Sequence, residues 1–264
     1  MSKPIASARE GLISVELAGF SILPIARGPL AAYLLERVRV KEKTNLFFAN
    51  TNLMVQCAGI SQRFRHPDSL MVNDGIGLSI AAKIFRNRSF PENLNGTDFV
   101  PFLLKQADRP LRVFLYGATS TSNKKAAESV SGMGHLVVGA IDGYQIISTE
   151  ELVSGMAATQ PDVVLVALGN PRQEMWVLDH ADTLPPALFI GVGALFDFLA
   201  GTVPRAPQWV QSMRLEWLFR LSREPRRLWK RYTLDIFRFL ALCSGIGQAP
   251  ESKDGPLGIQ TTNS

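Results

Sequence analysis

The chain has 264 residues, of which 46% are hydrophobic and 19% charged, and its net charge is +5. These values describe a folded globular protein with one large α/β domain, alone or with an appendage. The two cysteines, Cys57 and Cys243, match no metal-binding or redox spacing and are expected to be buried, reduced thiols. The N-terminus lacks the apolar core of a signal peptide, and no uncharged apolar run approaches the roughly 20 residues that span a bilayer. We therefore expect a cytosolic protein that is not integral to a membrane.

In chain order, apolar runs alternate with polar turns and helical patterns. Strands are expected at 13–25 (one or two short ones), 46–49, 70–72, 111–116, 136–140, 163–168 and 188–192. Helices are expected around 29–40, 54–58, 78–85, 124–131 and 150–159, with another beginning at Pro171. Because strand, turn and helix recur, the sequence predicts an α/β fold with a Rossmann-like parallel sheet, helices on both faces, and ligand-binding groups gathered along one edge.

The stretch 161–176 combines a buried strand with a polar turn. The run 163–168 has no polar alternation, which is typical of a strand covered on both faces, and Gly169-Asn170-Pro171 ends it abruptly. Gln173 and Glu174 follow, at the carboxyl end of the strand where open α/β sheets bind ligands. An ordinary strand-to-helix turn with a solvated polar tip is the alternative.

Two other turns carry candidate polar groups. Asp74 follows the strand at 70–72 and is flanked by glycine, although Asp-Gly is also a common structural turn. The small residues at 117–122, of which those at 119–122 carry hydroxyl groups, precede a helix that they would either cap or open to a phosphate. The spacing of a Walker loop is missing and no GxGxxG follows a strand, so a nicotinamide oxidoreductase is disfavoured.

The basic charge is concentrated near the carboxyl end. Between Arg205 and Arg231 the sequence has eight basic and two acidic residues, a local balance of +6. Apolar residues at helical spacing accompany them, which predicts a basic amphipathic appendage over 204–243 that contacts anionic lipid. The alternatives are helices that cover the core, or an RNA-binding surface, for which no recognition module is present. The core is then 1–203, and 244–264 is expected to be a disordered tail.

Motifs in the expected order resemble the WecG/TagA/CpsF glycosyltransferase family over about 15–232. They are NDGIG (73–77), NGTDFVP (95–101), LYGAT (115–119), DGY (142–144), LGNPRQEMW (168–176), GVGALFDFLAG (191–201), RAPQW (205–209) and LEWLFRLSREPRRLWKR (215–231). The resemblance implies an inverting transfer from a UDP-sugar to a polyprenyl-diphosphate-linked sugar at the inner face of the bacterial cell membrane. The resemblance places this transfer in the synthesis of cell-wall polymers or exopolysaccharides. It also implies a Rossmann-like core without a DxD metal motif, a peripheral membrane appendage, and no cofactor.

The resemblance also assigns roles to residues. Asp74 matches the family's catalytic base, which suits single-step inversion because a carboxylate must take the proton of the acceptor hydroxyl. Asn52 and Gln173 match residues expected to hold donor or acceptor by hydrogen bonds. The full set of expected substrate-binding residues is Asn50, Asn52, Gly75, Thr97, Asp98, Gly117, Thr119, Asn170, Gln173, Glu174, Arg214, Arg220 and Arg223.

Two departures from the family pattern concern the donor. Asn50 stands where the family usually has threonine, and Asn93 where it has arginine, which removes a possible phosphate or carboxylate clamp. The donor is therefore left open between UDP-glucose and UDP-N-acetylmannosamine or its uronate. A non-catalytic polysaccharide-assembly binding protein is the alternative function, and a homo-oligomer is left open.

Overall fold

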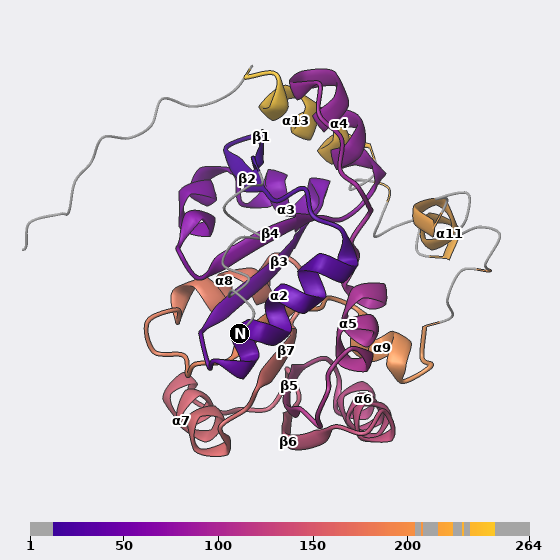
Figure 1. Ribbon diagram of the computed structural model, residues 1–264. Helices are drawn as coiled ribbons and strands as arrows, with labels where there is room; N and C mark the ends of the chain where they lie inside the picture. The colour runs from indigo at the N-terminus through magenta and orange to yellow at the C-terminus, as the bar shows by residue number, and fades with distance from the viewer. Residues whose placement is uncertain (1–12, 204–206, 208–215, 224–228, 230–232, 246–264) are drawn as a thin grey trace, which may run out of the picture.

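The computed structural model describes residues 13–203, 207, 216–223, 229 and 233–245. Within these residues the centre is a six-stranded parallel sheet in the order β4-β3-β8-β7-β5-β6 (Figure 1). The strands are β3 (Thr44–Ala49), β4 (Ser69–Asn73), β5 (Arg112–Gly117), β6 (Leu136–Ile141), β7 (Val163–Ala167) and β8 (Leu188–Gly191). The predicted α/β fold is confirmed.

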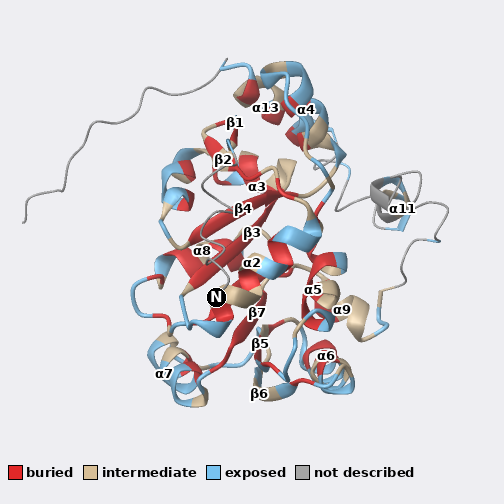
Figure 2. Cartoon of the chain, in the orientation of Figure 1, coloured by how far each residue is buried: buried red, intermediate tan, exposed pale blue. Residues whose placement is uncertain are grey.

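Apolar side chains on both faces explain why these strands lie inside the domain. In β7, Val163 and Leu165 pack into one core cluster, whereas Val164 and Val166 pack into the other. Side chains alternate across a strand, so an uninterrupted apolar run suits a sheet that is covered on both faces. Figure 2 shows the central strands buried. At one edge β6 is only partly buried, and its Leu136 is exposed.

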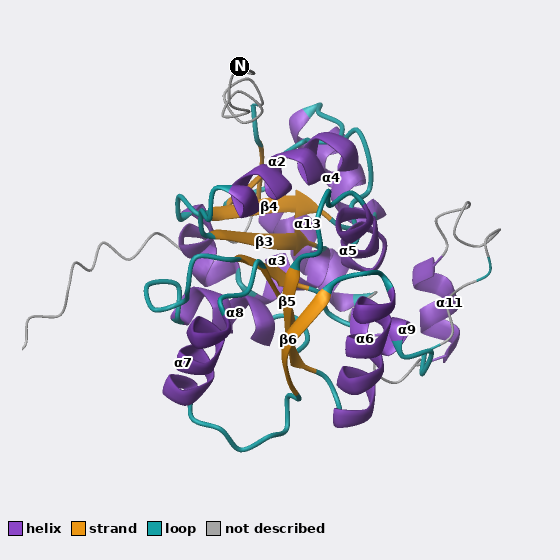
Figure 3. Cartoon of the chain, turned by 60° about the horizontal axis from the view of Figure 1, so that its bottom comes forward, coloured by secondary structure: helices purple, strands orange, loops and turns teal. Residues whose placement is uncertain are grey.

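Two layers of helices cover the sheet (Figure 3). The first core cluster contains residues of α2 (Arg27–Arg39), α5 (Gly96–Lys105), α6 (Ser120–Gly132) and α9 (Leu195–Leu199). The second contains residues of α3 (Thr51–Gln56), η1 (Ala58–Arg65), α4 (Ile76–Arg86), α7 (Thr149–Thr159), α8 (Arg172–Asp179) and α13 (Leu234–Cys243). The antiparallel pair β1 (Val15–Leu17) and β2 (Phe20–Ile22) also packs into this second cluster.

The last described helix, α13, is part of the domain core. Phe239 and Cys243 are each 1% exposed and belong to the second core cluster, and α13 contacts α3 and α4. The sequence analysis assigned the segment 204–243, which contains Phe239, to an appendage that contacts lipid. For this residue the alternative holds, because its ring is covered by the core. Both cysteines are buried and free, as expected.

Several element bounds differ from the sequence prediction for local reasons. α6 begins at Ser120, four residues earlier than predicted, because Thr119 Oγ1 accepts a hydrogen bond from the backbone N–H of Ser122 and caps the helix. Pro171 is the residue before α8 and not its first residue. The division of the chain at 203 and 243 stays a prediction, since much of that segment and nearly all of the tail lie outside the described residues.

Candidate functional site at the carboxyl edge of the sheet

Parallel strands bring the predicted site residues to one edge of the sheet. The loops after β3, β4, β5, β7 and β8 all leave from the carboxyl ends of their strands. In the sheet, β3 and β4 lie on one side of β8, and β7, β5 and β6 lie on the other. After β4 the chain crosses to β5 on the other side, so the direction in which strands are added reverses between β3 and β7. Open α/β sheets bind ligands at such a point, outside the carboxyl ends of the strands.

A hydrogen-bonded network joins the loop after β7 to the start of α3. Asn52 Nδ2 donates to Asn170 Oδ1 at 2.6 Å, and Asn170 Nδ2 donates to Glu174 Oε1 at 3.3 Å. Gln173 Nε2 donates to the same Glu174 oxygen at 2.8 Å. These four predicted residues are therefore brought together by the fold, although 118 positions separate Asn52 from Asn170.

Gln173 extends the network to the turn after β8. Its Oε1 accepts a hydrogen bond from the backbone N–H of Gly193 at 3.0 Å. A Cβ at Gly191 would lie 2.9 Å from Gln173 Nε2, so the glycine leaves the space that the amide occupies. Gln173 is 3% and Glu174 1% exposed, which contradicts the alternative of a solvated polar tip. A buried carboxylate held by two side-chain amides has a fixed position.

Asp74 lies in the turn between β4 and α4. Its backbone N–H donates to Ala49 O at 2.6 Å, which ties the turn to the end of β3. Gly75 has a φ of +101°, a conformation that favours glycine, and its N–H donates to Asn93 Oδ1. Asp74 is partly exposed, so its carboxylate is within reach of a ligand. Asn93, which the sequence analysis noted only as a departure from the family, thus holds the backbone of the Asp74 turn.

The turns after β3 and β4 approach each other closely. A Cβ at Gly77, in the first turn of α4, would meet Thr51 Cγ2 at 2.8 Å. Asn50 lies next to Thr51 and accepts the backbone N–H of Leu53 at 3.0 Å, which caps α3. The glycine therefore allows the Asp74 turn to lie against the helix that carries Asn52.

Other predicted residues shape helix starts at this edge. Asn95 Oδ1 accepts the Thr97 hydroxyl at 2.7 Å and the Asp98 N–H at 2.8 Å, at the start of α5. Gly117 has a φ of +115°, and a Cβ there would lie 2.5 Å from the Ala167 backbone. In the structure Asn50, Thr97, Asp98 and Thr119 take part in capping contacts at the starts of α3, α5 and α6. Their role in binding substrate stays a prediction.

The basic residues predicted to reach the site are only partly described. Arg214 and the side chain of Arg220 lie outside the described residues. Arg223, at the end of α11 (Glu216–Arg223), is exposed and stacks its guanidinium 5.6 Å from the centroid of the Phe219 ring. These contacts do not place an arginine at the carboxyl edge, and that role stays a prediction.

Cys57, which follows α3, is a neighbour of the network that sequence reasoning did not connect with the site. It is 1% exposed, and burial together with the negative charge of Glu174 raises the pKa of its thiol to about 11. The thiol is therefore protonated at neutral pH and is not a nucleophile. The sequence carries no signal for this proximity, because Cys57 and Glu174 are far apart along the chain.

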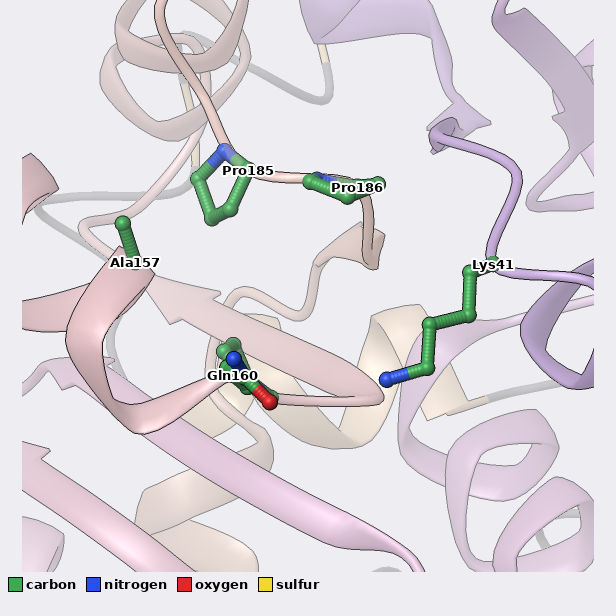
Figure 4. Close-up of a pocket in the computed structure, with 6 residues that line it drawn as sticks. Lys41, Ala157, Gln160, Pro185 and Pro186 are labelled. Atoms are coloured by element: carbon green, nitrogen blue, oxygen red, sulfur yellow. The ribbon is translucent and has the colours of Figure 1, made fainter.

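A separate hollow of about 350 Å³ lies at the opposite edge of the sheet, where β3, β7 and β8 begin (Figure 4). It is lined by Lys41, Ala157, Gln160, Pro161, Pro185 and Pro186. Prolines and a single lysine supply no acid, base or nucleophile pair. This hollow is therefore not a candidate catalytic site.

The described residues contain neither a metal-binding cluster nor a helix that could span a membrane. In this part of the chain no group of three or more His, Cys, Asp or Glu side chains is placed to hold a metal ion. None of the helices described is long and apolar enough to cross a membrane.

An α/β domain with a fixed polar network at the carboxyl edge of a parallel sheet is typical of an enzyme that handles a polar ligand. The chain matches the Glycosyl transferase WecG/TagA/CpsF family over residues 15–251. It belongs to this family and is a glycosyltransferase, as the motifs indicated.

Two relatives are informative. One, from Bacillus subtilis (strain 168), is an N-acetylglucosaminyldiphosphoundecaprenol N-acetyl-beta-D-mannosaminyltransferase. It is 31% identical over 219 residues, which cover 79% of this chain and 84% of the relative. The other, from Bacillus spizizenii (strain ATCC 23059 / NRRL B-14472 / W23), has the same name. It is 35% identical over 161 residues, which cover 60% of this chain and 62% of the relative.

Proposed function

We propose that the protein transfers a sugar from a UDP-sugar to a polyprenyl-diphosphate-linked N-acetylglucosamine, with inversion at the anomeric carbon and with Asp74 as the general base. The names of the two relatives support this acceptor, because both act on N-acetylglucosaminyldiphosphoundecaprenol. The observation that carries the proposal is the partly exposed Asp74 turn beside the network of Asn52, Asn170, Gln173 and Glu174.

The proposed mechanism assigns one task to each part of the edge. Asp74 takes the proton from the acceptor hydroxyl while that oxygen forms its bond to the anomeric carbon and the bond to the UDP oxygen breaks. The amides of Asn52 and Asn170 hold sugar or nucleotide hydroxyls, and the buried Glu174 holds Asn170, which in turn binds Asn52. Helix N-termini at the same edge, such as that of α6, stabilise diphosphate charge.

The donor remains part of the proposal. Asn93 binds the Gly75 backbone in this chain. It stands at the position where the family pattern has arginine. The donors left open are UDP-glucose, UDP-N-acetylmannosamine and its uronate, and the missing positive charge favours the two neutral sugars over the negatively charged uronate.

A donor panel tests the function directly. The protein is incubated with each of the three UDP-sugars and a polyprenyl-diphosphate-linked N-acetylglucosamine, and the product is analysed for mass and anomeric configuration. We expect one donor to give a β-linked disaccharide from its α-linked UDP-sugar. Binding of the acceptor without turnover of any donor would favour the non-catalytic assembly protein instead.

A further inference from the structure

Helix α4 exposes a stripe of isoleucines next to the candidate site. Ile76, Ile80 and Ile84 are 41%, 48% and 66% exposed. Residues four positions apart lie on one face of a helix, so the three side chains form a continuous apolar row. The opposite face of α4 is also apolar and is buried in the second core cluster. Neither packing within the domain nor the solubility of the protein requires these three isoleucines to be exposed.

Basic residues border this row. The segment 76–88 contains Lys83, Arg86 and Arg88, all exposed, and no acidic residue. Lys83 lies seven positions after Ile76 and therefore on the same face as the row. Arg86 Nε donates to Glu16 O at 2.7 Å, which fixes it at the end of the helix. The segment 76–88 thus combines exposed apolar side chains with a net charge of +3.

Helix α13 lies beside α4 and exposes further apolar side chains (Figures 1 and 3). Leu234 is 47% and Phe237 73% exposed, while the core holds the other face of the helix. Its one exposed cation, Arg238, pairs with Asp235 at 3.6 Å, so α13 adds apolar surface without net charge. Two neighbouring helices therefore keep large apolar groups in contact with solvent.

We propose that this face, formed by Ile76, Ile80 and Ile84 of α4 with Phe237 of α13 nearby, docks on the surface of a bilayer that contains anionic lipids. The inference rests on the proposed function, because a lipid-linked acceptor has to be met at a membrane. Apolar side chains enter the headgroup region while the bordering lysine and arginines bind anionic headgroups.

Position and charge favour a lipid surface over a second copy of the chain. Ile76 follows Asp74 by two residues, so a bilayer at this face would lie next to the turn that carries the proposed base. Two copies joined through the same face would bring Lys83, Arg86 and Arg88 against each other, and like charges oppose such a contact. The docking face extends beyond the appendage predicted over 204–243: Phe237 falls within that range, but Ile76, Ile80 and Ile84 belong to α4 of the α/β core.

The test uses the full chain and removes only exposed groups. The double variant Ile80→Gln and Ile84→Gln leaves the Asp74 turn intact, and the matched control is Val40→Gln with Ile146→Gln, two apolar residues exposed elsewhere. Sedimentation with phosphatidylglycerol–phosphatidylcholine vesicles should show that the α4 variant binds about tenfold more weakly than the wild type, and that the control binds like it. A third variant, Lys83→Glu, should weaken binding to these vesicles and leave binding to pure phosphatidylcholine unchanged.

Two more readouts separate the possible failures. Turnover of a soluble short-chain acceptor should be the same in the α4 variant and the wild type, whereas turnover of a vesicle-bound acceptor should fall in the variant. Unchanged vesicle binding with normal turnover overturns the docking face and leaves the proposed function standing. In another outcome, light scattering without lipid shows that the α4 variant has lost an oligomer, while its vesicle binding is unchanged. That outcome assigns the face to a second copy and also overturns the inference. Weaker vesicle binding without turnover of any acceptor supports the face and rejects the transferase function.

Discussion

The two edges of the sheet use polar groups in different ways. At the amino edge, Asp162 is buried and accepts hydrogen bonds from Arg109 at 2.8 and 3.0 Å and from the Arg112 backbone at 2.9 Å. At the carboxyl edge, Glu174 is buried and accepts hydrogen bonds from the amides of Gln173 and Asn170. The ion pair holds strand ends together, whereas the amides gather polar groups from three loops. Changes at the first edge should alter stability, and changes at the second should alter turnover.

Replacing Asp74 with Asn should have the largest effect on turnover. The amide cannot take the proton of the acceptor hydroxyl, so turnover should fall on the order of a hundredfold or more. The Asp74 backbone hydrogen bond to Ala49 does not depend on the side chain, and the melting temperature and donor affinity should stay close to those of the wild type. A variant that turns over normally would show that Asp74 is only a turn residue.

Replacing Gln173 with Ala should lower turnover by about tenfold and the free energy of unfolding by about 1–2 kcal/mol, because Glu174 and the Gly193 N–H each lose a partner. Gly191→Ala should lower turnover in the same direction, since its Cβ would displace the Gln173 amide. Gly155→Ala is the matched control, because a Cβ there meets nothing within 4 Å. Equal turnover in the Gln173→Ala, Gly191→Ala and Gly155→Ala variants would show that the hydrogen-bonded network does not contribute to catalysis.

Replacing Asp162 with Ala should lower the free energy of unfolding by about 2 kcal/mol and leave the turnover of the folded protein unchanged. Burial opposes ionisation of Asp162, but hydrogen bonds from Arg109 and the Arg112 backbone and the charges of Arg109 and Lys41 outweigh it and hold the pKa below its ordinary value of 3.8. The stabilisation is therefore complete above that value and is lost as the pH falls through the lower pKa of the folded state. In urea denaturation, the free energies of unfolding of the wild type and the Asp162→Ala variant should converge below about pH 4. A constant difference down to pH 2 would contradict this linkage.

Removal of divalent ions should have the smallest effect. Diphosphate charge is assigned to helix N-termini and arginines, so turnover should be the same in EDTA as in magnesium. Complete loss in EDTA, with recovery on adding magnesium or manganese, would show that the carboxyl edge needs an ion.

The sequence predicted the sheet better than it predicted the contacts of the site. Strands such as β7 are uninterrupted apolar runs, so their position follows from the residues alone. Gln173 and Asn170 were placed at the correct edge because parallel strands end there. Asn52 was assigned to the site through the family resemblance alone, and its contact with Asn170, like the contacts of Cys57 and Gly193, could not be derived by pattern because these residues meet only after distant loops converge. Asn93 and Phe239 show the same limit, since their contacts depend on neighbours from other elements.

The two buried thiols provide chemical reporters of local opening. Cys57 lies next to Glu174 in the site, and Cys243 anchors α13, and burial raises the pKa of each thiol to about 11. Only a thiolate reacts rapidly with an alkylating reagent, so labelling at neutral pH requires the surrounding structure to open first. The labelling rate of Cys57 measures how often the site opens, and that of Cys243 how often α13 leaves the core. A donor that slows the first rate alone would be bound at the network, whereas vesicles that change the second rate alone would act through α13.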